Sequence, residues 1–148
     1  MKAIRRQYNI DVALRLLELE KNGQIEDALK YIAYDYLMTW MYYSAKIDTI
    51  FPTSSRNAID FMDNLAEVYQ IKGRSYEIKN IAGTSDVVMI ELVESYEPSP
   101  GAPAFRTPLV LVLEFSEGKV RRGRHYCDPA ISHLHLSQAA IDKAFNCC

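Results

Sequence analysis

Two side chains that could transfer or donate a proton lie close together near the end of the sequence, at Tyr126 and Asp128. We expect a strand over about 119–128, and alternation along it places Arg124, Tyr126 and Asp128 on one face. A carboxylate in the wall of an apolar pocket can act as a general acid or base, because burial raises its pKa toward neutrality. A tyrosine hydroxyl beside it can donate a hydrogen bond to a ligand carbonyl or to a developing oxyanion. The pattern makes Asp128 and Tyr126 candidate catalytic residues and Arg124 a candidate ligand-binding residue.

Each of these residues also has a structural interpretation, which stays open from the sequence. Asp128 precedes Pro129 and could cap the following turn while pairing with Arg124. Tyr126 could be a half-buried strand aromatic whose hydroxyl is already hydrogen bonded.

A second group of candidates lies in the aromatic segment 34–43, which we expect to be extended because it has no polar stripe of helical period. Alternation would put Tyr34, Tyr36 and Trp40 on one side and Asp35 on the other. Asp35, between two tyrosines, is a candidate base, or else it stabilises a junction between a helix and a strand. Tyr36 and Trp40 are candidate ligand-binding residues, with core packing or a dimer surface as the alternatives.

The elements that must position these residues follow from hydrophobic periodicity. Helices are predicted from Asn9, as the capping residue, to Asn22-Gly23, over about 24–32 and over about 56–71, after the turn at 52–55. Tyr69 falls on the apolar face of the third helix and is a further candidate ligand-binding residue.

Four strands are predicted to follow, and their breaks are marked by Gly83-Thr84, a Pro-rich loop at 98–103 and the tight turn at 116–118. The strands span about 74–82, 85–97, 106–116 and 119–128, and the tail over about 130–146 could form a last helix. Helices grouped at the front and a largely antiparallel sheet behind them define an α+β domain. At 148 residues the chain is expected to be one domain, 1–148, with a core of about 9–128.

Composition excludes several classes of protein. Apolar residues make up 49% of the chain, and the formal net charge is −2, which provides no general attraction to nucleic acid or to acidic membranes. Three cysteines suggest no disulfide framework, and no window is apolar enough to span a bilayer, so we expect a cytoplasmic protein. The sequence contains no phosphate-binding loop, no nucleophile elbow and no spacing typical of a metal site. It therefore predicts neither a cofactor nor a metal.

The run Glu117-Gly118-Lys119-Val120 and the strand ending Tyr126-Cys127-Asp128 resemble the closing hairpin of SnoaL-like proteins in the nuclear transport factor 2 (NTF2)-like superfamily. The stretch from Ala28 to Tyr36 is similar to the passage from the second helix into the first strand of that family, and the order of elements matches over about 9–128. The resemblance implies a curved, mostly antiparallel sheet wrapped around three helices, forming a cone with an apolar pocket.

Known catalytic members of the family show where this sequence departs from them. The resemblance implies an Asp-Arg-Asp arrangement for epoxide hydrolases of this fold, yet the strand around Ile90 contains Glu91 and Glu94 and no arginine. The residues that form the active sites of ketosteroid isomerase and scytalone dehydratase also have no counterparts in this sequence. The fold alone therefore does not name a reaction.

Two functions stay open from the sequence. The first is a domain that binds a small hydrophobic, cyclic or polyketide-like molecule. Catalysis by acid–base chemistry, as an isomerase, cyclase, dehydratase or hydrolase, is one option for such a domain. The second is a non-catalytic homodimeric module for ligand binding or protein interaction, since the strands carry more apolar residues than one solvated sheet face needs.

Overall fold

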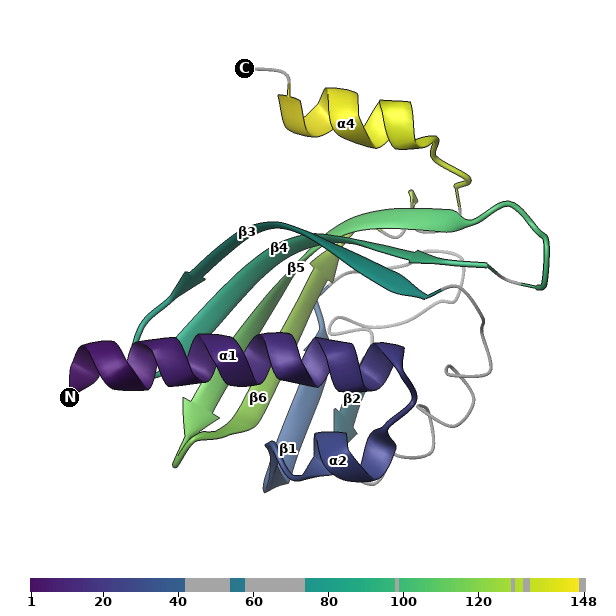
Figure 1. The fold of residues 1–148 in the computed structure, drawn as a ribbon. Helices are drawn as coiled ribbons and strands as arrows, with labels where there is room; N and C mark the ends of the chain where they lie inside the picture. The colour runs from purple at the N-terminus through teal and green to yellow at the C-terminus, as the bar shows by residue number, and fades with distance from the viewer. Residues whose placement is uncertain (42–53, 58–73, 98, 129, 132–133, 147–148) are drawn as a thin grey trace.

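The structure is a computed structural model, and it describes residues 1–41, 54–57, 74–97, 99–128, 130–131 and 134–146 (Figure 1). Six strands form one curved sheet in the order β2-β1-β6-β5-β4-β3, in which only the β1–β6 pair is parallel. The predicted α+β class with a mostly antiparallel sheet is confirmed. The described elements are α1 (Lys2–Lys21), α2 (Ile25–Leu29), β1 (Ile32–Trp40), β2 (Ser54–Asn57), β3 (Ser75–Gly83), β4 (Val87–Tyr96), β5 (Phe105–Ser116), β6 (Lys119–Cys127) and α4 (Gln138–Asn146).

The meander β3 to β6 has the predicted strands, each within two residues of its expected bounds. Its last turn is a two-residue hairpin in which Ser116 pairs with Lys119. Glu117 and Gly118 both have positive φ angles, of 53° and 76°, which is the backbone of a type I′ turn. The right-handed twist of that turn matches the twist of the flanking strands, so the glycine determines where β6 begins.

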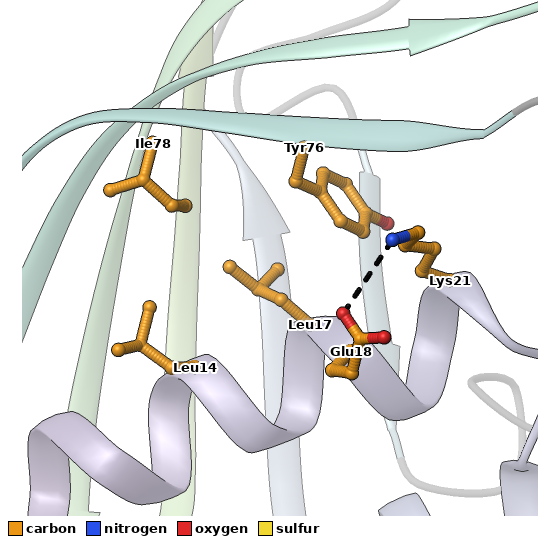
Figure 2. A pocket seen from close by; sticks show the side chains of 6 residues that line it. All are labelled: Leu14, Leu17, Glu18, Lys21, Tyr76 and Ile78. Atoms are coloured by element: carbon orange, nitrogen blue, oxygen red, sulfur yellow. Dashed lines mark ion pairs between the residues drawn. The ribbon is translucent and has the colours of Figure 1, made fainter.

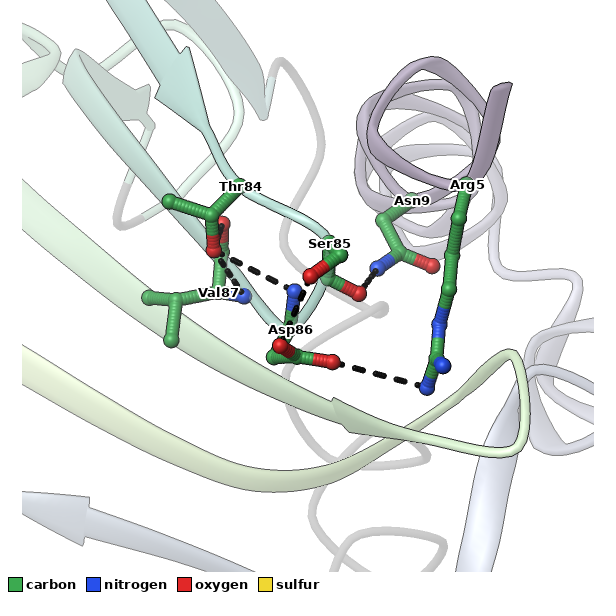
Figure 3. Close-up of polar contacts among 6 residues, drawn as sticks. All are labelled: Arg5, Asn9, Thr84, Ser85, Asp86 and Val87. Atoms are coloured by element: carbon green, nitrogen blue, oxygen red, sulfur yellow. Dashed lines mark hydrogen bonds and ion pairs between the residues drawn. The ribbon is translucent and has the colours of Figure 1, made fainter. Parts of the chain in front are cut away.

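Helix α1 begins earlier than predicted, and Asn9 is not its cap. Asn9 lies inside the helix and is fully buried, and its Nδ2 atom donates a hydrogen bond of 2.8 Å to the backbone oxygen of Ser85 (Figure 3). Arg5 forms an ion pair with Asp86 at 3.5 Å in the same turn, which connects β3 and β4. The sequence alone does not separate this role from capping, because the carbonyl that Asn9 binds lies 76 residues further along the chain.

The end of α1 is as predicted, at Asn22-Gly23. The N–H of Gly23, whose φ is 68°, donates to the carbonyl of Glu20, and the N–H of Gln24 donates to that of Leu19. This pair of bonds is the Schellman motif, which ends a helix at a glycine in the left-handed region. The motif sets the direction in which the last turn of α1 approaches the sheet.

Strand β1 is extended as predicted, but the expected alternation of its side chains is wrong at Tyr34. Tyr34 is 96% exposed and Tyr36 is 2% exposed, although they are two residues apart. The β1–β6 register is irregular between Ile32 and Leu37, and such an irregularity interrupts the two-residue period.

The predicted third helix lies mostly outside the described residues, and Tyr69 lies there with it. At its expected start the structure differs, since Ser54–Asn57 is a strand that pairs antiparallel with β1. The last helix is shorter than predicted and covers Gln138–Asn146.

The main core lies between α1 and the concave face of the sheet (Figure 1). It is built from alternate residues of β4 and β5, among them Val88, Ile90 and Leu92, packed against the apolar stripe of α1. Helix α4 lies on the opposite side of the sheet, where its Ile141 is 1% exposed. Among the described residues there is no helix of the length and hydropathy that crossing a membrane would require.

Candidate functional site

The expected inward orientation of Asp128 is wrong. Asp128 is exposed, and its Oδ1 atom accepts a hydrogen bond of 2.8 Å from the backbone N–H of Ala130. This is the turn-capping arrangement that the sequence left open as an alternative. The contact does not exclude a catalytic role, but it removes the apolar surroundings from which that role was inferred, so the role stays a prediction.

Tyr126 and Arg124 are also directed away from the core. Tyr126 is 39% exposed, and Arg124 forms an ion pair with Glu114 on the neighbouring strand rather than with Asp128. The residues of β6 that meet the core are the alternate ones, among them Gly123 and Cys127. The strand was predicted correctly, and the assignment of its faces was reversed.

Asp35 lies at the surface of β1, where its Oδ2 atom accepts a hydrogen bond of 2.7 Å from Nε of Arg121. The two side chains are 30% and 50% exposed. The contact joins β1 to β6, not a helix to a strand as the structural interpretation expected, and a role of Asp35 as a base stays a prediction.

Tyr36 and Trp40 do lie on the core side of β1. Tyr36 belongs to the core cluster, and the Trp40 ring is 6.2 Å from that of His125, its partner in the β1–β6 register. Burial raises the pKa of the Tyr36 hydroxyl, and the negative charge of Glu20 raises it further. Tyr36 is therefore a neutral hydroxyl on the inner side of the sheet, close to a carboxyl group.

That carboxyl group belongs to a polar cluster on the concave face that sequence analysis did not identify. Arg74, directly before β3, places its Nη2 atom 3.1 Å from Oε1 of Glu94 on β4. Tyr76 pairs with Glu94 across the two strands, so their side chains share a face. Tyr76 hydrogen bonds to Glu20, in the last turn of α1, and Arg74 hydrogen bonds to Tyr76. We call Glu20, Arg74, Tyr76 and Glu94 the inner polar cluster.

The electrostatics of the inner polar cluster favour a protonated carboxyl group near neutral pH. Burial, the largest cause, raises the pKa of Glu20 to about 8, with a smaller contribution from the charge of Glu94. The Arg74 charge and the Tyr76 hydrogen bond oppose that shift without cancelling it. Burial also raises the pKa of Glu94, although Arg74 lowers it. A carboxyl group with a pKa near neutrality can both donate and accept a proton.

Two further groups on the described inner face, His125 and Cys127, are uncharged at pH 7. Burial lowers the pKa of His125 to about 4 and raises that of Cys127 to about 11. The Arg74 guanidinium also lies 5.8 Å from the centre of the Tyr96 ring. Among the described residues, no group of three or more His, Cys, Asp or Glu side chains could hold a metal ion.

A cavity of about 200 Å³ opens beside the cluster, between α1 and β3 (Figure 2). Leu14, Leu17 and Ile78 form its apolar walls, while Glu18 and Lys21 stand at one side as an exposed ion pair of 3.7 Å. Tyr76 also lines this cavity, so it connects the cavity to Glu20.

The inner polar cluster had a weak signal in the sequence. Glu20 continues the apolar face of α1 at helical spacing from Leu16 and Leu17, and Glu94 continues the alternation of Ile90 and Leu92. A carboxylate that falls on an apolar face is worth noting, because burial of an unpaired charge is costly. Spacing alone could not show that the two meet around one arginine.

Comparison of the sequence with protein-family models finds no match, and no curated protein matches it either. Solved structures do match. The LEH-like epoxide hydrolase of M. tuberculosis superposes with a TM-score of 0.69 at 15% identity, over 94% of this chain and 96% of that chain. IdmH of Streptomyces antibioticus, described as a candidate polyketide cyclase, superposes with a TM-score of 0.68 at 15% identity, over 84% and 94%.

An NTF2-like protein of unknown function from Cytophaga hutchinsonii superposes with a TM-score of 0.62 at 11% identity, over 82% of this chain and 91% of that chain. At these identities the comparisons show the fold. The chain has the NTF2-like fold, as the resemblance of its hairpin and its order of elements implied.

Proposed function

We propose that this protein is a cytoplasmic SnoaL-like domain that binds a small hydrophobic molecule, cyclic or polyketide-like, and acts on it by acid–base chemistry. The inner polar cluster is the observation that carries the proposal. It combines two carboxyl groups, one guanidinium and a tyrosine hydroxyl on the concave face of the sheet. In this proposal Glu20 transfers the proton, and Tyr76 donates a hydrogen bond.

The physical argument is the match between the pKa of Glu20 and the pH at which the protein works. A general acid or base is most effective when its pKa lies near the operating pH. Burial raises the pKa of Glu20 to about 8, while the Arg74 charge keeps it from rising further. An apolar core around these groups would exclude water and strengthen their interactions with a ligand.

Two of the structural neighbours lend support to this class of function. One is named an epoxide hydrolase, and another is described as a candidate polyketide cyclase. The two glutamates around Arg74 also form a carboxylate–arginine–carboxylate set, the kind of arrangement that the resemblance associates with epoxide hydrolases of this fold. Here the set comes from α1, from the residue before β3 and from β4, so the reaction itself stays general: isomerisation, cyclisation, dehydration or hydrolysis.

Native mass spectrometry of the purified protein tests the proposal by detecting a co-purifying small molecule. We expect an adduct that is lost in Glu20→Gln, which keeps the shape of the side chain and removes its ability to titrate. Asp128→Asn is the matched variant, since it makes the same change at the other candidate acid. Loss of the adduct in Asp128→Asn with retention in Glu20→Gln would return the role to Asp128, and retention in both would refute a contribution of either carboxyl group to ligand binding.

The alternative function, a non-catalytic homodimer, has its own observation. On the outer face of the sheet Met89 pairs with Val112 and Tyr126 with Val110, and Met89 and Tyr126 are 50% and 39% exposed. Light scattering at micromolar concentration distinguishes the functions. A dimer that Met89→Lys dissociates, while Glu20→Gln does not, would favour the interaction module, and a strict monomer would eliminate it.

A further inference from the structure

The charge balance of the inner polar cluster is uneven. Two carboxyl groups, Glu20 from α1 and Glu94 from β4, face a single guanidinium, that of Arg74. If both carboxyl groups were ionised, one negative charge on the inner face would have no counterpart within this cluster. An uncompensated charge away from water is costly, and a group in that position takes up a proton instead.

The groups that face Glu20 from the other described elements do not supply the missing charge. Tyr36 on β1 and Tyr76 on β3 are hydroxyls that stay neutral, because burial raises the pKa of each. His125 and Cys127 on β6 share the inner face and are also neutral at pH 7, because burial lowers the pKa of the first and raises that of the second.

The contacts indicate which carboxyl group carries the proton. Glu94 forms the direct ion pair with Arg74, at 3.1 Å, and only 18% of its side chain is exposed. Glu20 reaches the guanidinium through the hydroxyl of Tyr76, which accepts a hydrogen bond from Arg74 and donates one to Glu20. The carboxylate in direct contact with the cation is the better stabilised anion.

We propose that burial beside the Arg74–Glu94 ion pair holds Glu20 as a neutral carboxylic acid, so that the site donates a proton to an oxygen atom of an uncharged ligand. This inference rests on the proposed function, because it specifies how the same cluster would act. Arg74 and Glu94 are positioning residues in it, since they act through Glu20.

The step is a single proton transfer. The O–H bond of Glu20 breaks, and a new O–H bond forms on a hydroxyl or carbonyl oxygen of the ligand. The electron pair stays on Glu20, which becomes a carboxylate that accepts the Tyr76 hydrogen bond and is attracted by Arg74. Water returns the proton after the product leaves. An anionic ligand is disfavoured, because it would meet Glu94 and the newly formed carboxylate.

Carbon-13 NMR of protein labelled at the glutamate carboxyl carbon measures the protonation state without any ligand. The Glu20 signal, assigned by its disappearance in Glu20→Gln, is expected to titrate near pH 8. Glu94→Gln removes a negative charge that raises the pKa of Glu20, so it should move that midpoint downward, whereas Glu18→Gln, an exposed neighbour, should leave it unchanged. Titration of wild-type Glu20 near its ordinary value of 4.5 would overturn the inference. The wild-type titration decides this by itself if Glu94→Gln does not fold.

Cyclohexanone and cyclohexanecarboxylate form a matched pair of probes for the ligand class. At pH 7 we expect cyclohexanone to shift the Glu20 signal and the carboxylate to bind about tenfold more weakly or worse, because like charges repel. Equal binding, or no response of Glu20 to either probe, would overturn the ligand class.

The outcomes separate this inference from the proposed function. A Glu20 midpoint near 4.5 together with an adduct lost in Glu20→Gln would refute the neutral acid and leave the proposed function standing. A midpoint near 8 together with an adduct retained in Glu20→Gln and lost in Asp128→Asn would support the neutral acid and return the functional role to Asp128.

Discussion

Arg74 and Glu94 form the most enclosed ion pair in the described part of the chain, with 13% and 18% of their side chains exposed and 3.1 Å between Nη2 and Oε1. The arginine also lies against the ring of Tyr96 and hydrogen bonds to Tyr76. Removal of Arg74 therefore leaves the Glu94 carboxylate without its direct ion-pair partner in a largely apolar setting.

Arg74→Met is expected to lower the free energy of unfolding by about 3 kcal/mol, the usual cost of breaking such a pair. The double variant Arg74→Met/Glu94→Leu should recover most of this loss, because no buried charge remains. Chemical denaturation of both single variants and the double variant measures the coupling between the two residues. If the loss in the double variant equals the sum of the losses in the two single variants, there is no coupling energy between Arg74 and Glu94.

Stability should fall as pH rises from about 4.5 to 8, because of Glu20. Burial raises the pKa of this group to about 8 from its ordinary 4.5, so the folded state holds a proton that the unfolded state has already lost. The stabilisation is fully present below pH 4.5 and disappears as pH rises through 8. Thermal unfolding between pH 6.5 and 8 measures this slope where the lowered pKa of His125 has little influence, and the slope should level off above pH 8.

Glu20→Gln is the control for this pH dependence, because glutamine cannot titrate. We expect the variant to have a flatter profile between neutrality and pH 8 than the wild type. Burial raises the pKa of Glu94 as well, and any slope from that residue is common to both proteins. Identical profiles of the wild type and Glu20→Gln would mean that Glu20 titrates normally in the folded protein.

Asn9→Leu should destabilise the protein by about 1–3 kcal/mol, because it leaves the backbone oxygen of Ser85 without its 2.8 Å hydrogen bond. Gln7→Leu is the matched change on the same helix, where the side chain is exposed and bonds only to Asp11. The midpoints of urea unfolding compare the two variants. A loss at Gln7 as large as that at Asn9 would show that the contact with Ser85 is not the cause.

Two glycines with similar φ angles allow the effect of backbone conformation to be separated from steric crowding of an added Cβ atom. Gly118 and Gly101 have φ angles of 76° and 79°, and alanine in that region costs about 1 kcal/mol. A Cβ atom at Gly118 would lie 3.1 Å from Cε1 of Tyr8, while one at Gly101 would have no neighbour within 4 Å. Gly118→Ala is therefore expected to lower the unfolding midpoint more than Gly101→Ala does, and Tyr8→Ala should remove the difference.

The strands and their breaks could be predicted because local signals determine them. Glycine turns and alternating apolar residues mark β3 to β6, and the structure differs there by two residues at most. Which face of β6 meets the core was harder to predict, because both sides of this strand mix polar and apolar residues. The outward position of Tyr34 depends on an irregular register with β6, which no feature within β1 reveals.

The assembly of the inner polar cluster could not be predicted, for a different reason. Its members are far apart in the chain, and each alone is an ordinary charged or aromatic residue. Their pKa values depend on burial by elements that meet only in the folded protein. Asp128 is the more conspicuous candidate in the sequence, because it is an acid only two residues from an aromatic hydroxyl, Tyr126.

Helix α1 is held at both ends, by the hydrogen bond of Asn9 to Ser85 and by the glycine cap that follows Glu20. Asn9 and Glu20 are eleven residues apart, which at 3.6 residues per turn is close to three whole turns, so both point to the sheet. Insertion of a single residue between them would rotate one relative to the other by about 100°. The rotation of this helix about its axis therefore determines both whether Asn9 reaches the β3–β4 turn and whether Glu20 faces the sheet. An insertion between the two residues would keep both orientations only if it added close to a whole number of turns.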